Sequence, residues 1–428
     1  MQAHASRRER VQRAMSKGDV AVFISAPSLI RSNDVHHRFR QDSDFYYLTG
    51  FDEEEAALVI EPDRCILYLR RRDPEKETWN GPMLGVDRAV ATLEIDEARD
   101  INSFRTDIPT LLKNRETLYY MFGRNREMDF FLLETSDRLL RRSRAGDFGP
   151  SKIVHSALLL HEMRLVKDRG EIDKMRLAAD ITADAHLALF EKTRVSMFEY
   201  ELESIIHEAF RKRNATEAYP SIVAAGKNAC ILHYIKNDEK IGADQLILVD
   251  AGAEKDYMNG DVTRTYPSGK TFTSPQRDAY QVVLDAQLNA IDRTVTGISM
   301  EEVHNLTVRD LVGGLISLKV LSGTVDENIE NGTYKKYYMH RTGHWLGLDV
   351  HDVGSYNVNG APRKMEPGMI CTVEPGLYFP DEADVPEHFR GIGIRIEDDV
   401  LVTSGKAEVL TARIPKSVKD IEAIRSGV

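Results

Sequence analysis

Two aspartates at the ends of apolar runs are the first residues in this sequence with an evident chemical use. Asp250 ends the run LILVD, Asp261 begins DVTRTYP, and we expect a short turn containing Gly and Asn between them. We expect a hairpin that brings the two carboxylates side by side. Adjacent buried anions repel each other unless a cation compensates them, and a divalent metal is the usual compensation. The alternative is that each aspartate caps a turn, and these two residues alone leave both interpretations open.

Further ligand-type residues follow downstream. The segment MHRTGHWLGLDVHD places His340, His344 and His351 within twelve residues, beside the apolar run Trp-Leu-Gly-Leu. This combination predicts a dry cavity with ligands and proton carriers, although any one of them could be a satisfied core histidine. Glu374 in TVEPGLYF and Glu397 in GIGIRIEDD each end an apolar run, where a charged side chain needs a partner. A solvent-facing glutamate explains either one singly but explains the pair poorly.

The combined residue types favour a hydrolytic metal centre. Four carboxylates and one imidazole suit borderline-hard divalent ions such as Mn²⁺, Co²⁺ or Zn²⁺. They supply enough bridging oxygens for two ions roughly 3.5 Å apart, a pair that generates a hydroxide at neutral pH and polarises a carbonyl. The candidate ligands are Asp250, Asp261, Glu374 and Glu397 together with one histidine of the cluster.

The first part of the chain must provide one of two expected domains, because 428 residues exceed one ordinary core. Short apolar runs alternate there with charged helical stretches, including a polar helix over 1–16, which predicts an α/β domain around a mixed sheet. The expected strands are Val20–Ile24, Ala57–Ile60, Cys65–Leu69 and Thr117–Phe122. The polar segment 142–152 is the linker candidate. We therefore expect an N-terminal domain over 1–165 and a catalytic domain over 166–428.

The second part of the chain alternates long helices with short strands that end at the candidate ligands. Amphipathic spacing predicts helices over 168–192, 197–213, 276–294 and 300–321. Strands are expected over 246–251, 262–266, 369–373 and 392–397. No internal repeat is visible in this sequence.

Composition excludes several classes of protein. An apolar fraction of 42% and a charged fraction of 29% are those of a soluble globular protein. No apolar run is long enough to span a membrane, and the charged N-terminus does not resemble a secretory signal. Three scattered cysteines do not form a disulfide framework, so we expect a cytoplasmic protein. The net charge of −11 argues against a nucleic-acid partner.

The order and spacing of five motifs resemble a known family. VDAG, GDVTRT, HWLGLDVHD, TVEPGLY and GIGIRIED are similar to the aminopeptidase P branch of the pita-bread metallopeptidases, and RSNDVHHRFRQDSDFYYLTGF resembles the family's N-terminal segment. The resemblance covers essentially the whole chain. It implies an α/β N-terminal domain and an α+β pita-bread catalytic domain, in which two related halves surround a curved antiparallel sheet. It also implies removal of the first amino acid from peptides with proline in second position.

The resemblance assigns the metal ligands. Asp250 would chelate one of two metal ions, with Mn²⁺ preferred over Co²⁺ or Zn²⁺, while Asp261 and Glu397 would bridge both ions. His344 and Glu374 would complete the two shells. Glu374 would also accept a proton from the bridging water, and the resulting hydroxide would attack the carbonyl before proline.

The resemblance also assigns residues around the substrate. His351 would hydrogen-bond the carbonyl side of the intermediate, and His233 would lie across the site. His340 and Arg395 would wall the proline pocket, and Tyr378 would join Arg395 in a relay around Asp250. A structural ion pair of Arg395 with Glu397 or Asp398 is the alternative for that arginine.

Two residues of the N-terminal half match a loop that, in the family, reaches into the cleft of a neighbouring subunit. These are Asp34 and Trp79, which implies a homo-oligomer, either a dimer or a tetramer. Ordinary packing is the alternative for Trp79. Cys230, close to His233, is either sensitive to oxidation or a buried inert thiol.

One residue departs from the family's pattern. Relatives usually carry glycine or another small residue directly after the first histidine of the cluster, whereas this chain has Arg341. Its long, positively charged side chain near the mouth of the pocket puts in question how bulky or charged the substrate residue after proline can be. It could also supply the extra cation that a prolidase, the second functional hypothesis, needs for the carboxylate of an Xaa-Pro dipeptide. A non-catalytic binding protein is the third hypothesis, and such proteins typically have lost ligands that this chain retains.

Overall fold

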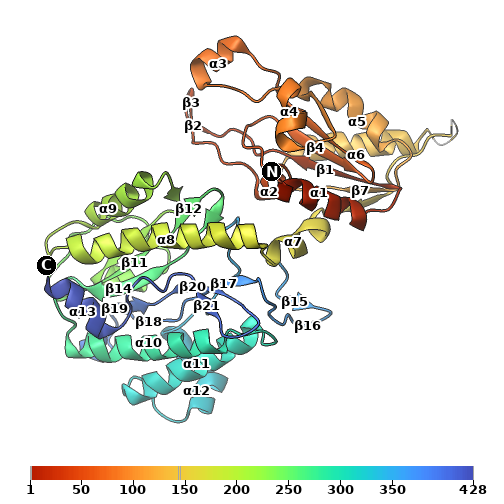
Figure 1. Cartoon of the computed structure of the whole chain (residues 1–428). Coiled ribbons are helices and arrows are strands. Elements are labelled where there is room, and N and C mark those ends of the chain that lie inside the picture. Colours follow the sequence, from red (N-terminus) through yellow and green to blue (C-terminus); the bar gives the residue numbers. More distant parts are fainter. Residues whose placement is uncertain (1, 143, 145, 428) are drawn as a thin grey trace. The chain divides into compact units, whose positions relative to one another are not determined.

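The computed structural model describes residues 2–142, 144 and 146–427, and it divides into two compact units, 1–161 and 162–428 (Figure 1). The boundary falls within helix α7 (Ala157–Leu165), and the predicted division at 165/166 lies four residues further along. The helix expectation at residue 1 and the linker expectation at 143 and 145 lie outside the described residues.

The first unit is built on a six-stranded mixed sheet with the order β6-β5-β4-β1-β7-β8. Its strands are β1 (Asp19–Ile24), β4 (Ala57–Glu61), β5 (Arg64–Leu69), β6 (Glu97–Asp100), β7 (Thr117–Tyr119) and β8 (Lys152–Val154). Strand β1 runs antiparallel to β4 and parallel to β7, as a mixed sheet requires. Apolar runs form the central strands because both faces of β1 and β4 are buried. The predicted α/β class is confirmed, and Lys152, the last residue of the predicted linker, already begins β8.

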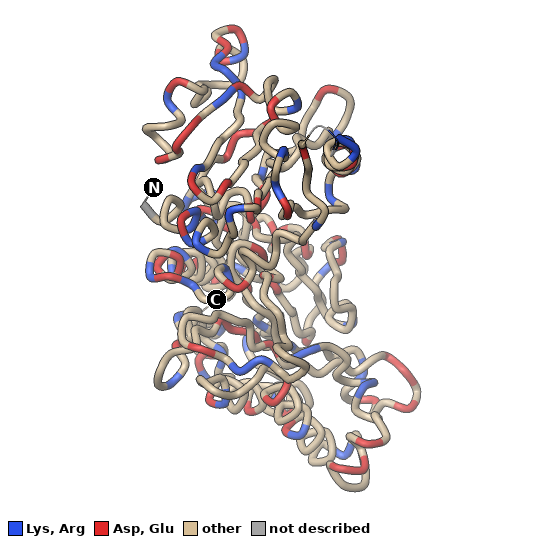
Figure 2. The backbone as a smooth tube through the Cα atoms, turned by 90° about the vertical axis from the view of Figure 1, so that its right-hand side faces the viewer, with Lys and Arg blue, Asp and Glu red and all other residues tan. Residues whose placement is uncertain are grey.

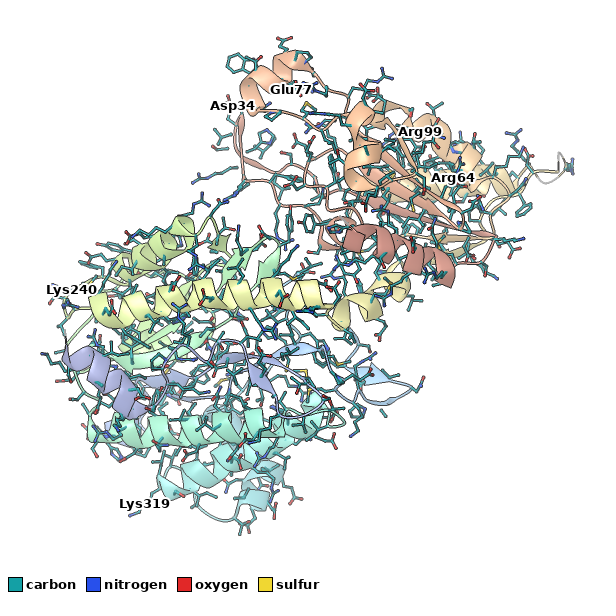
Figure 3. All side chains as sticks on the ribbon, in the orientation of Figure 1. Asp34, Arg64, Glu77, Arg99, Lys240 and Lys319 are labelled. Atoms are coloured by element: carbon teal, nitrogen blue, oxygen red, sulfur yellow. The ribbon has the colours of Figure 1, made fainter. Side chains whose placement is uncertain are left out.

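Helices flank this sheet, and a short hairpin projects from it. The helices are α1 (Gln2–Ala14), α2 (Ser43–Thr49), α3 (Pro74–Asn80), α4 (Val86–Leu93), α5 (Phe104–Leu112) and α6 (Arg126–Leu140). The hairpin consists of β2 (Ile30–Ser32) and β3 (Val35–His36), both exposed along their whole length. Asp34 lies in its turn, and its side chain is drawn at the edge of the unit (Figure 3).

The second unit contains two pairs of long helices. Its helices are α8 (Arg169–Lys192), α9 (Glu199–Lys212), α10 (Ser274–Arg293), α11 (Met300–Ser317), α12 (Val325–Asn331) and α13 (Val418–Ser426). Helix α8 packs against α9, and α10 packs against α11. Reciprocal capping fixes where two of them begin: Asp168 with Glu171 for α8, and Ser299 with Glu302 for α11.

Antiparallel strands follow each helix pair, which gives the two related halves of a pita-bread fold (Figure 1). The first set is β9 (Thr216–Glu217), β10 (Ile222–Ala225), β11 (Leu246–Asp250), β12 (Ala253–Lys255), β13 (Met258–Asn259) and β14 (Thr263–Pro267). The second set is β15 (Asn357–Val358), β16 (Ala361–Pro362), β17 (Ile370–Val373), β18 (Gly376–Phe379), β19 (Ile392–Arg395), β20 (Asp398–Leu401) and β21 (Glu408–Val409). Strands β10-β11-β14, β17-β20-β21 and β18-β19 pair antiparallel. The expected α+β class is confirmed.

One large apolar core joins the helix pairs to these strands. Phe190 of α8 packs edge-on against Tyr266 of β14, with ring centroids 5.0 Å apart, and Leu377 of β18 is fully buried in the same cluster. Such a core holds the strand ends rigidly, which a precise site needs. Within the described residues, no helix is both long and apolar enough to cross a membrane. Basic and acidic residues are interspersed along both units (Figure 2).

Candidate metal centre

The predicted aspartate pair lies beside two neighbouring strands, with Asp250 as the last residue of β11 and Asp261 two residues before β14. Asp250 ends β11 opposite Thr263, and the backbone N–H of Ala251 donates to the Val262 carbonyl at 3.0 Å. The link between the aspartates is the β12–β13 hairpin, so the short turn expected from sequence is wrong in length. Glycine is required in this link, since a Cβ at Gly252 would lie 1.7 Å from the carbonyl oxygen of Gly260.

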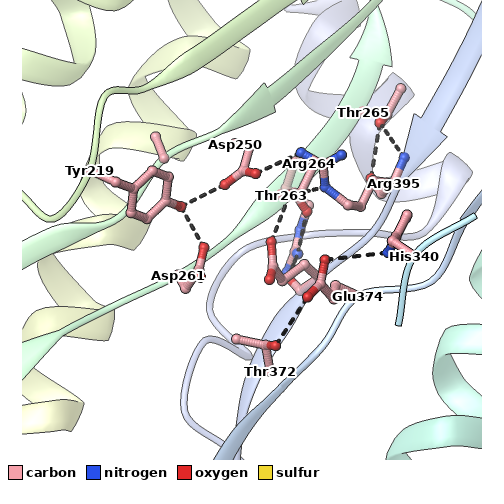
Figure 4. A network of polar contacts seen from close by, with 12 residues as sticks. Tyr219, Asp250, Asp261, Thr263, Arg264, Thr265, His340, Thr372, Glu374 and Arg395 are labelled. Carbon is pink, nitrogen blue, oxygen red and sulfur yellow. Dashed lines mark hydrogen bonds and ion pairs between the residues drawn. The ribbon is translucent and has the colours of Figure 1, made fainter. Parts of the chain in front are cut away.

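A tyrosine hydroxyl holds the two carboxylates side by side. The Tyr219 hydroxyl lies 2.6 Å from Asp250 Oδ1 and 2.5 Å from Asp261 Oδ1 (Figure 4). Burial, together with the charges of Asp250 and Asp261, raises the pKa of Tyr219 well above its usual value, so the hydroxyl stays protonated as a donor. The preceding residue, Ala218, donates its N–H to the Gly252 carbonyl at 2.9 Å, which fixes this segment against the hairpin.

His344 and Glu374 approach the pair from the second half of the fold. A Cβ at Gly343 would lie 1.9 Å from the Thr372 carbonyl oxygen, so the loop before His344 packs directly on β17, the strand that Glu374 follows. His344 Nε2 lies 3.3 Å from Asp261 Oδ2 and 3.7 Å from Glu374 Oε1. His344 Nδ1 donates to the Trp345 carbonyl at 3.0 Å. Nε2 therefore faces the carboxylates, which is the usual arrangement of a metal-binding histidine.

Glu397 completes the group from the turn between β19 and β20. Its Oε2 accepts a hydrogen bond from Thr263 Oγ1 at 2.6 Å, and its backbone N–H donates to the Thr263 carbonyl at 3.0 Å. One ligand atom each from Asp261, His344 and Glu397 lie within 4.8 Å of one another. All five predicted ligand residues line one cleft with a volume of about 930 Å³.

The charges of this group call for a cation. Burial raises the pKa of Asp250 and of Glu397, and it raises that of Glu374 to about 7. Burial alone would lower the pKa of His344, but its hydrogen bond to Asp261 and the nearby negative charges raise it to about 9. His344 thus carries a positive charge among the carboxylates. The group as a whole still has less positive than negative charge. Its carboxylate oxygens and single imidazole are donors that fit borderline-hard divalent ions well.

Arg395 forms the predicted relay around Asp250. Its Nη2 lies 2.6 Å from Asp250 Oδ2, and its Nε donates to Thr263 Oγ1 at 2.9 Å (Figure 4). Its Nη1 donates to the Tyr378 hydroxyl at 3.0 Å. The alternative pairing of Arg395 with Asp398 is wrong, because Asp398 pairs with Arg264 at 2.7 Å.

His340 stands at the end of this relay. Its Nδ1 donates to the Arg341 carbonyl at 2.7 Å, so its Nε2, 2.8 Å from the Tyr378 hydroxyl, acts as the acceptor. Burial and the charge of Arg395 lower the pKa of His340 to about 3. His340 is therefore a neutral ring whose two nitrogens both have protein partners, and it presents its surface to the cleft.

The remaining predicted histidines also line the cleft. His351 and His233 are exposed, and the ring of His351 stands edge-on to that of His344 with centroids 4.4 Å apart. Cys230 Sγ lies 3.5 Å from the carbonyl oxygens of Phe379 and Ile392. Burial raises the pKa of Cys230 to about 11, which agrees with an inert thiol.

Asp34 and Trp79 belong to the first unit and are not part of the group assembled from 162–428. Asp34 is exposed in the turn of the β2–β3 hairpin. Trp79 on α3 has 82% of its surface exposed, so it does not pack in the core of its own unit.

Two residues of the centre escaped sequence reasoning. Tyr219 lies 31 positions before Asp250, and no spacing rule connects them. Thr263 lies two positions after Asp261 within GDVTRT. Because alternate strand residues face the same side, Thr263 could have been assigned to the face of Asp261.

Comparison with known proteins agrees with this geometry. Residues 173–404 match Metallopeptidase family M24, and residues 4–120 match Aminopeptidase P, N-terminal domain. An Xaa-Pro aminopeptidase of Haemophilus influenzae is 44% identical over 97% of this chain and 95% of its own length. One from Escherichia coli is 40% identical over 98% of this chain and 96% of its own length.

Solved structures give the same result. The aminopeptidase PepP of Pseudomonas aeruginosa superposes with a TM-score of 0.96 at 44% identity, covering 99% of this chain and 97% of that one. A zinc-substituted Escherichia coli aminopeptidase P in complex with product also has a TM-score of 0.96, at 40% identity, covering 100% of this chain and 98% of that one. This chain therefore belongs to metallopeptidase family M24, as a metallo-aminopeptidase with an aminopeptidase P N-terminal domain.

Proposed function

We propose that this chain removes the first amino acid from peptides that carry proline in second position. The observation that carries the proposal is the convergence of five ligand-type side chains in one cleft that four further histidines also line. The relatives to which this chain is similar over nearly their full lengths are named Xaa-Pro aminopeptidase, which supports the same reaction.

The five residues would hold two divalent ions. Asp250 would chelate one ion, Asp261 and Glu397 would bridge both, and His344 and Glu374 would complete the shells. We propose Mn²⁺ as the resident metal, with Co²⁺ or Zn²⁺ as alternatives, because the donor set is oxygen-rich with a single imidazole. When bound, such ions lower the pKa of water and polarise the carbonyl that precedes proline.

The chain's own residues would manage the protons and the geometry. Glu374 would accept the proton of the attacking water, and its position directly after β17 holds it beside His344. Arg395 would orient Asp250 through their ion pair. Thr263 accepts a hydrogen bond from Arg395 and donates one to Glu397. It would therefore fix the Glu397 carboxylate relative to Arg395, the residue that orients Asp250.

Three histidines would contact the peptide. His351, beside His344, would donate to the carbonyl oxygen as negative charge develops on it. His233 would bind from another part of the cleft wall. His340 has both ring nitrogens engaged, so it would wall the proline pocket with Arg395 by packing rather than by hydrogen bonding.

Metal reconstitution tests this proposal. Metal-stripped protein reloaded with Mn²⁺, Co²⁺ or Zn²⁺ should cleave Ala-Pro-Ala at the Ala-Pro bond, and metal analysis of the active form should give two equivalents per chain. Asp256→Asn, an exposed substitution on the β12–β13 hairpin, serves as the control and should remain active. Two bound equivalents without cleavage of any proline peptide would instead favour the non-catalytic hypothesis.

Prolidase activity is the competing hypothesis, and the relatives do not favour it. Cleavage of Ala-Pro measured beside cleavage of Ala-Pro-Ala separates the two. A prolidase would cleave only the dipeptide.

We also propose a homo-oligomer, a dimer or a tetramer, in which Asp34 and Trp79 of one subunit complete the cleft of another. Their exposure on the first unit supports this idea. Co-expressed Asp34→Ala and Asp261→Ala subunits provide the test. Mixed oligomers would join an intact metal site to an intact hairpin and recover activity that neither variant has alone, whereas a monomer would recover none.

We place this enzyme in a reducing compartment such as the cytoplasm, without a nucleic-acid partner. All three cysteines are free thiols, and the net charge is −11. Activity should therefore be indifferent to added reductant.

A further inference from the structure

Arg341 is a cation that lines the cleft and to which the proposed reaction gives no role. It directly follows His340, it is exposed, and it lines the same cleft as the candidate ligands. Within the part of the chain that the structure describes, it has no hydrogen bond or ion pair through its guanidinium. Its guanidinium donors are therefore available to a ligand.

The first turn of α11 adds further lining near this arginine. Met300, Glu301 and His304 all line the cleft. His304 Nδ1 lies 3.0 Å from Thr342 Oγ1, which also contacts the Tyr338 hydroxyl at 2.9 Å. Burial and then the charge of Arg341 lower the pKa of His304 to about 4, so this imidazole is neutral and adds no second positive charge to the wall.

The other two arginines of the cleft already have partners. Arg395 pairs with Asp250. Arg363 donates to Glu162 and to the Ser355 carbonyl, each at 2.6 Å. Glu301 lies in the same cleft but forms no ion pair with Arg341 among the described residues. Arg341 is therefore the cation in this wall whose charge is not already matched.

Arg341 is connected to the metal centre through His340. His340 Nδ1 lies 3.8 Å from Glu374 Oε2, and its ring is held by the carbonyl of Arg341 itself. If His340 contacts the proline of the substrate, Arg341, the next residue in the chain, lies where it can contact the residue that follows proline. This step rests on the proposed function.

We propose that Arg341, together with the first turn of α11, binds the residue after proline and favours a carboxylate there. The carboxylate could belong to the C-terminus of a tripeptide or to the side chain of Asp or Glu in a longer peptide. A planar guanidinium with several donors matches either source. This role differs from that of a prolidase cation, which would hold the carboxylate of proline itself.

Four peptides separate the two sources of the carboxylate. Metal-loaded full-length enzyme is assayed on Ala-Pro-Ala as acid and as amide, and on Ala-Pro-Glu-amide and Ala-Pro-Gln-amide. We expect kcat/KM to favour at least one carboxylate over its neutral partner by about three- to ten-fold, mostly through KM. The preference should shrink as salt screens the charge. A preference within the first pair indicates the C-terminus, and one within the second pair indicates the side chain.

Variants then assign the preference to Arg341. Arg341→Gln should reduce the ratio to about one, and Arg341→Lys should retain part of it. Glu301→Gln should raise the ratio, because it removes an anion from the same cleft. Lys406→Gln, which neutralises an exposed cation that does not line the cleft, is the matched control and should leave the ratio unchanged.

Two outcomes would overturn the inference. One is equal rates within both peptide pairs for the unmodified enzyme. The other is a carboxylate preference that survives Arg341→Gln. Failure of the proposed function is distinguishable from both, because the metal-loaded enzyme would then cleave none of the four peptides.

Discussion

Two consecutive buried carboxylates, Glu397 and Asp398, belong to two clusters of opposite character. Because successive residues in extended chain point to opposite sides, Glu397 faces the cleft and Asp398 faces the other way. Asp398 accepts from Arg264 Nη2 at 2.7 Å and from Lys416 Nζ at 2.6 Å. Gln287 and Thr411 satisfy it further, at 2.8 and 2.7 Å.

The difference between these clusters appears in their acidity. Burial alone would raise the pKa of Asp398, yet Arg264 and Lys416 lower it to about 2. Burial and neighbouring carboxylates raise the pKa of Glu397 well above its usual value, and Arg395 only partly opposes them. The Asp398 cluster is neutralised by the chain itself, whereas the cleft is left short of positive charge. A buried acidic cluster that the fold leaves uncompensated is therefore the better indicator of a metal site than carboxylate count alone.

The comparison is tested most strongly by Asp261→Ala. Loss of this proposed bridging ligand should reduce kcat/KM for Ala-Pro-Ala by at least about 10³-fold and lower the metal content. The melting temperature of the metal-free variant should be unchanged or higher, because one of several mutually repelling anions is gone. Steady-state kinetics with excess Mn²⁺, metal analysis and thermal unfolding provide the readouts. Turnover within tenfold of the unmodified enzyme would remove Asp261 from the ligand set.

Asp398→Asn should have the reverse profile. It leaves Arg264 and Lys416 buried without their counter-charge, so we expect a loss of roughly 3–5 kcal/mol in the free energy of unfolding. The folded fraction should still bind metal. Urea titration beside Asp256→Asn measures the loss, and the comparison fails if Asp398→Asn releases metal while keeping its stability.

The pH dependence of metal-free stability should also differ between the clusters. The pKa of Glu374 is raised from 4.5 to about 7 in the folded protein. Its contribution is thus fully present below about pH 4.5 and is lost as pH rises through 7, by at most about 3 kcal/mol. Asp398 has a lowered pKa, so its contribution is present above pH 3.8 and is lost as pH falls through 2.

Thermal unfolding of metal-free protein between pH 4.5 and 7.5 measures the Glu374 contribution. The melting temperature should fall across this range, and saturating Mn²⁺ should abolish the fall. Glu374→Gln should flatten the profile without metal. A profile that is equally steep in Glu374→Gln would assign the effect to other groups.

The sequence led to a set of candidate ligands that converge in one cleft, because metal chemistry restricts residue type and because most of these residues stand at an end of an apolar run. Asp250 is the last residue of β11, Glu374 directly follows β17, and Glu397 lies between β19 and β20. The helices were accessible for a similar reason, since Asp168 and Ser299 cap α8 and α11 locally. Local rules of this kind operate within a few residues of chain.

What the sequence did not reveal depends on contacts between distant segments. The duplicated order of helix pair and antiparallel strands leaves no visible repeat, because packing constrains apolar character rather than identity. The β12–β13 hairpin was also not predicted. It depends on a close backbone contact between Gly252 and Gly260, which a side chain on Gly252 would prevent. Tyr219 is held beside the aspartates by contacts of this kind, since the N–H of the preceding Ala218 donates to the Gly252 carbonyl.

Tyr219→Phe is the smallest expected change and tests whether the cleft carboxylates need a partner of their own. Deleting one hydroxyl removes the donor shared by Asp250 and Asp261 and leaves the ring in place. Such outer partners typically change metal affinity or activity by about 10- to 100-fold, and we expect the lower end because the ions would themselves orient the carboxylates. Titration of metal-free protein with Mn²⁺ should show the weakening, with Tyr200→Phe, an exposed tyrosine on α9, as the matched control. Unchanged metal affinity in Tyr219→Phe would mean that the metal ions alone hold the aspartates together. The cleft would then depend on its cations as completely as the Asp398 cluster depends on Arg264 and Lys416.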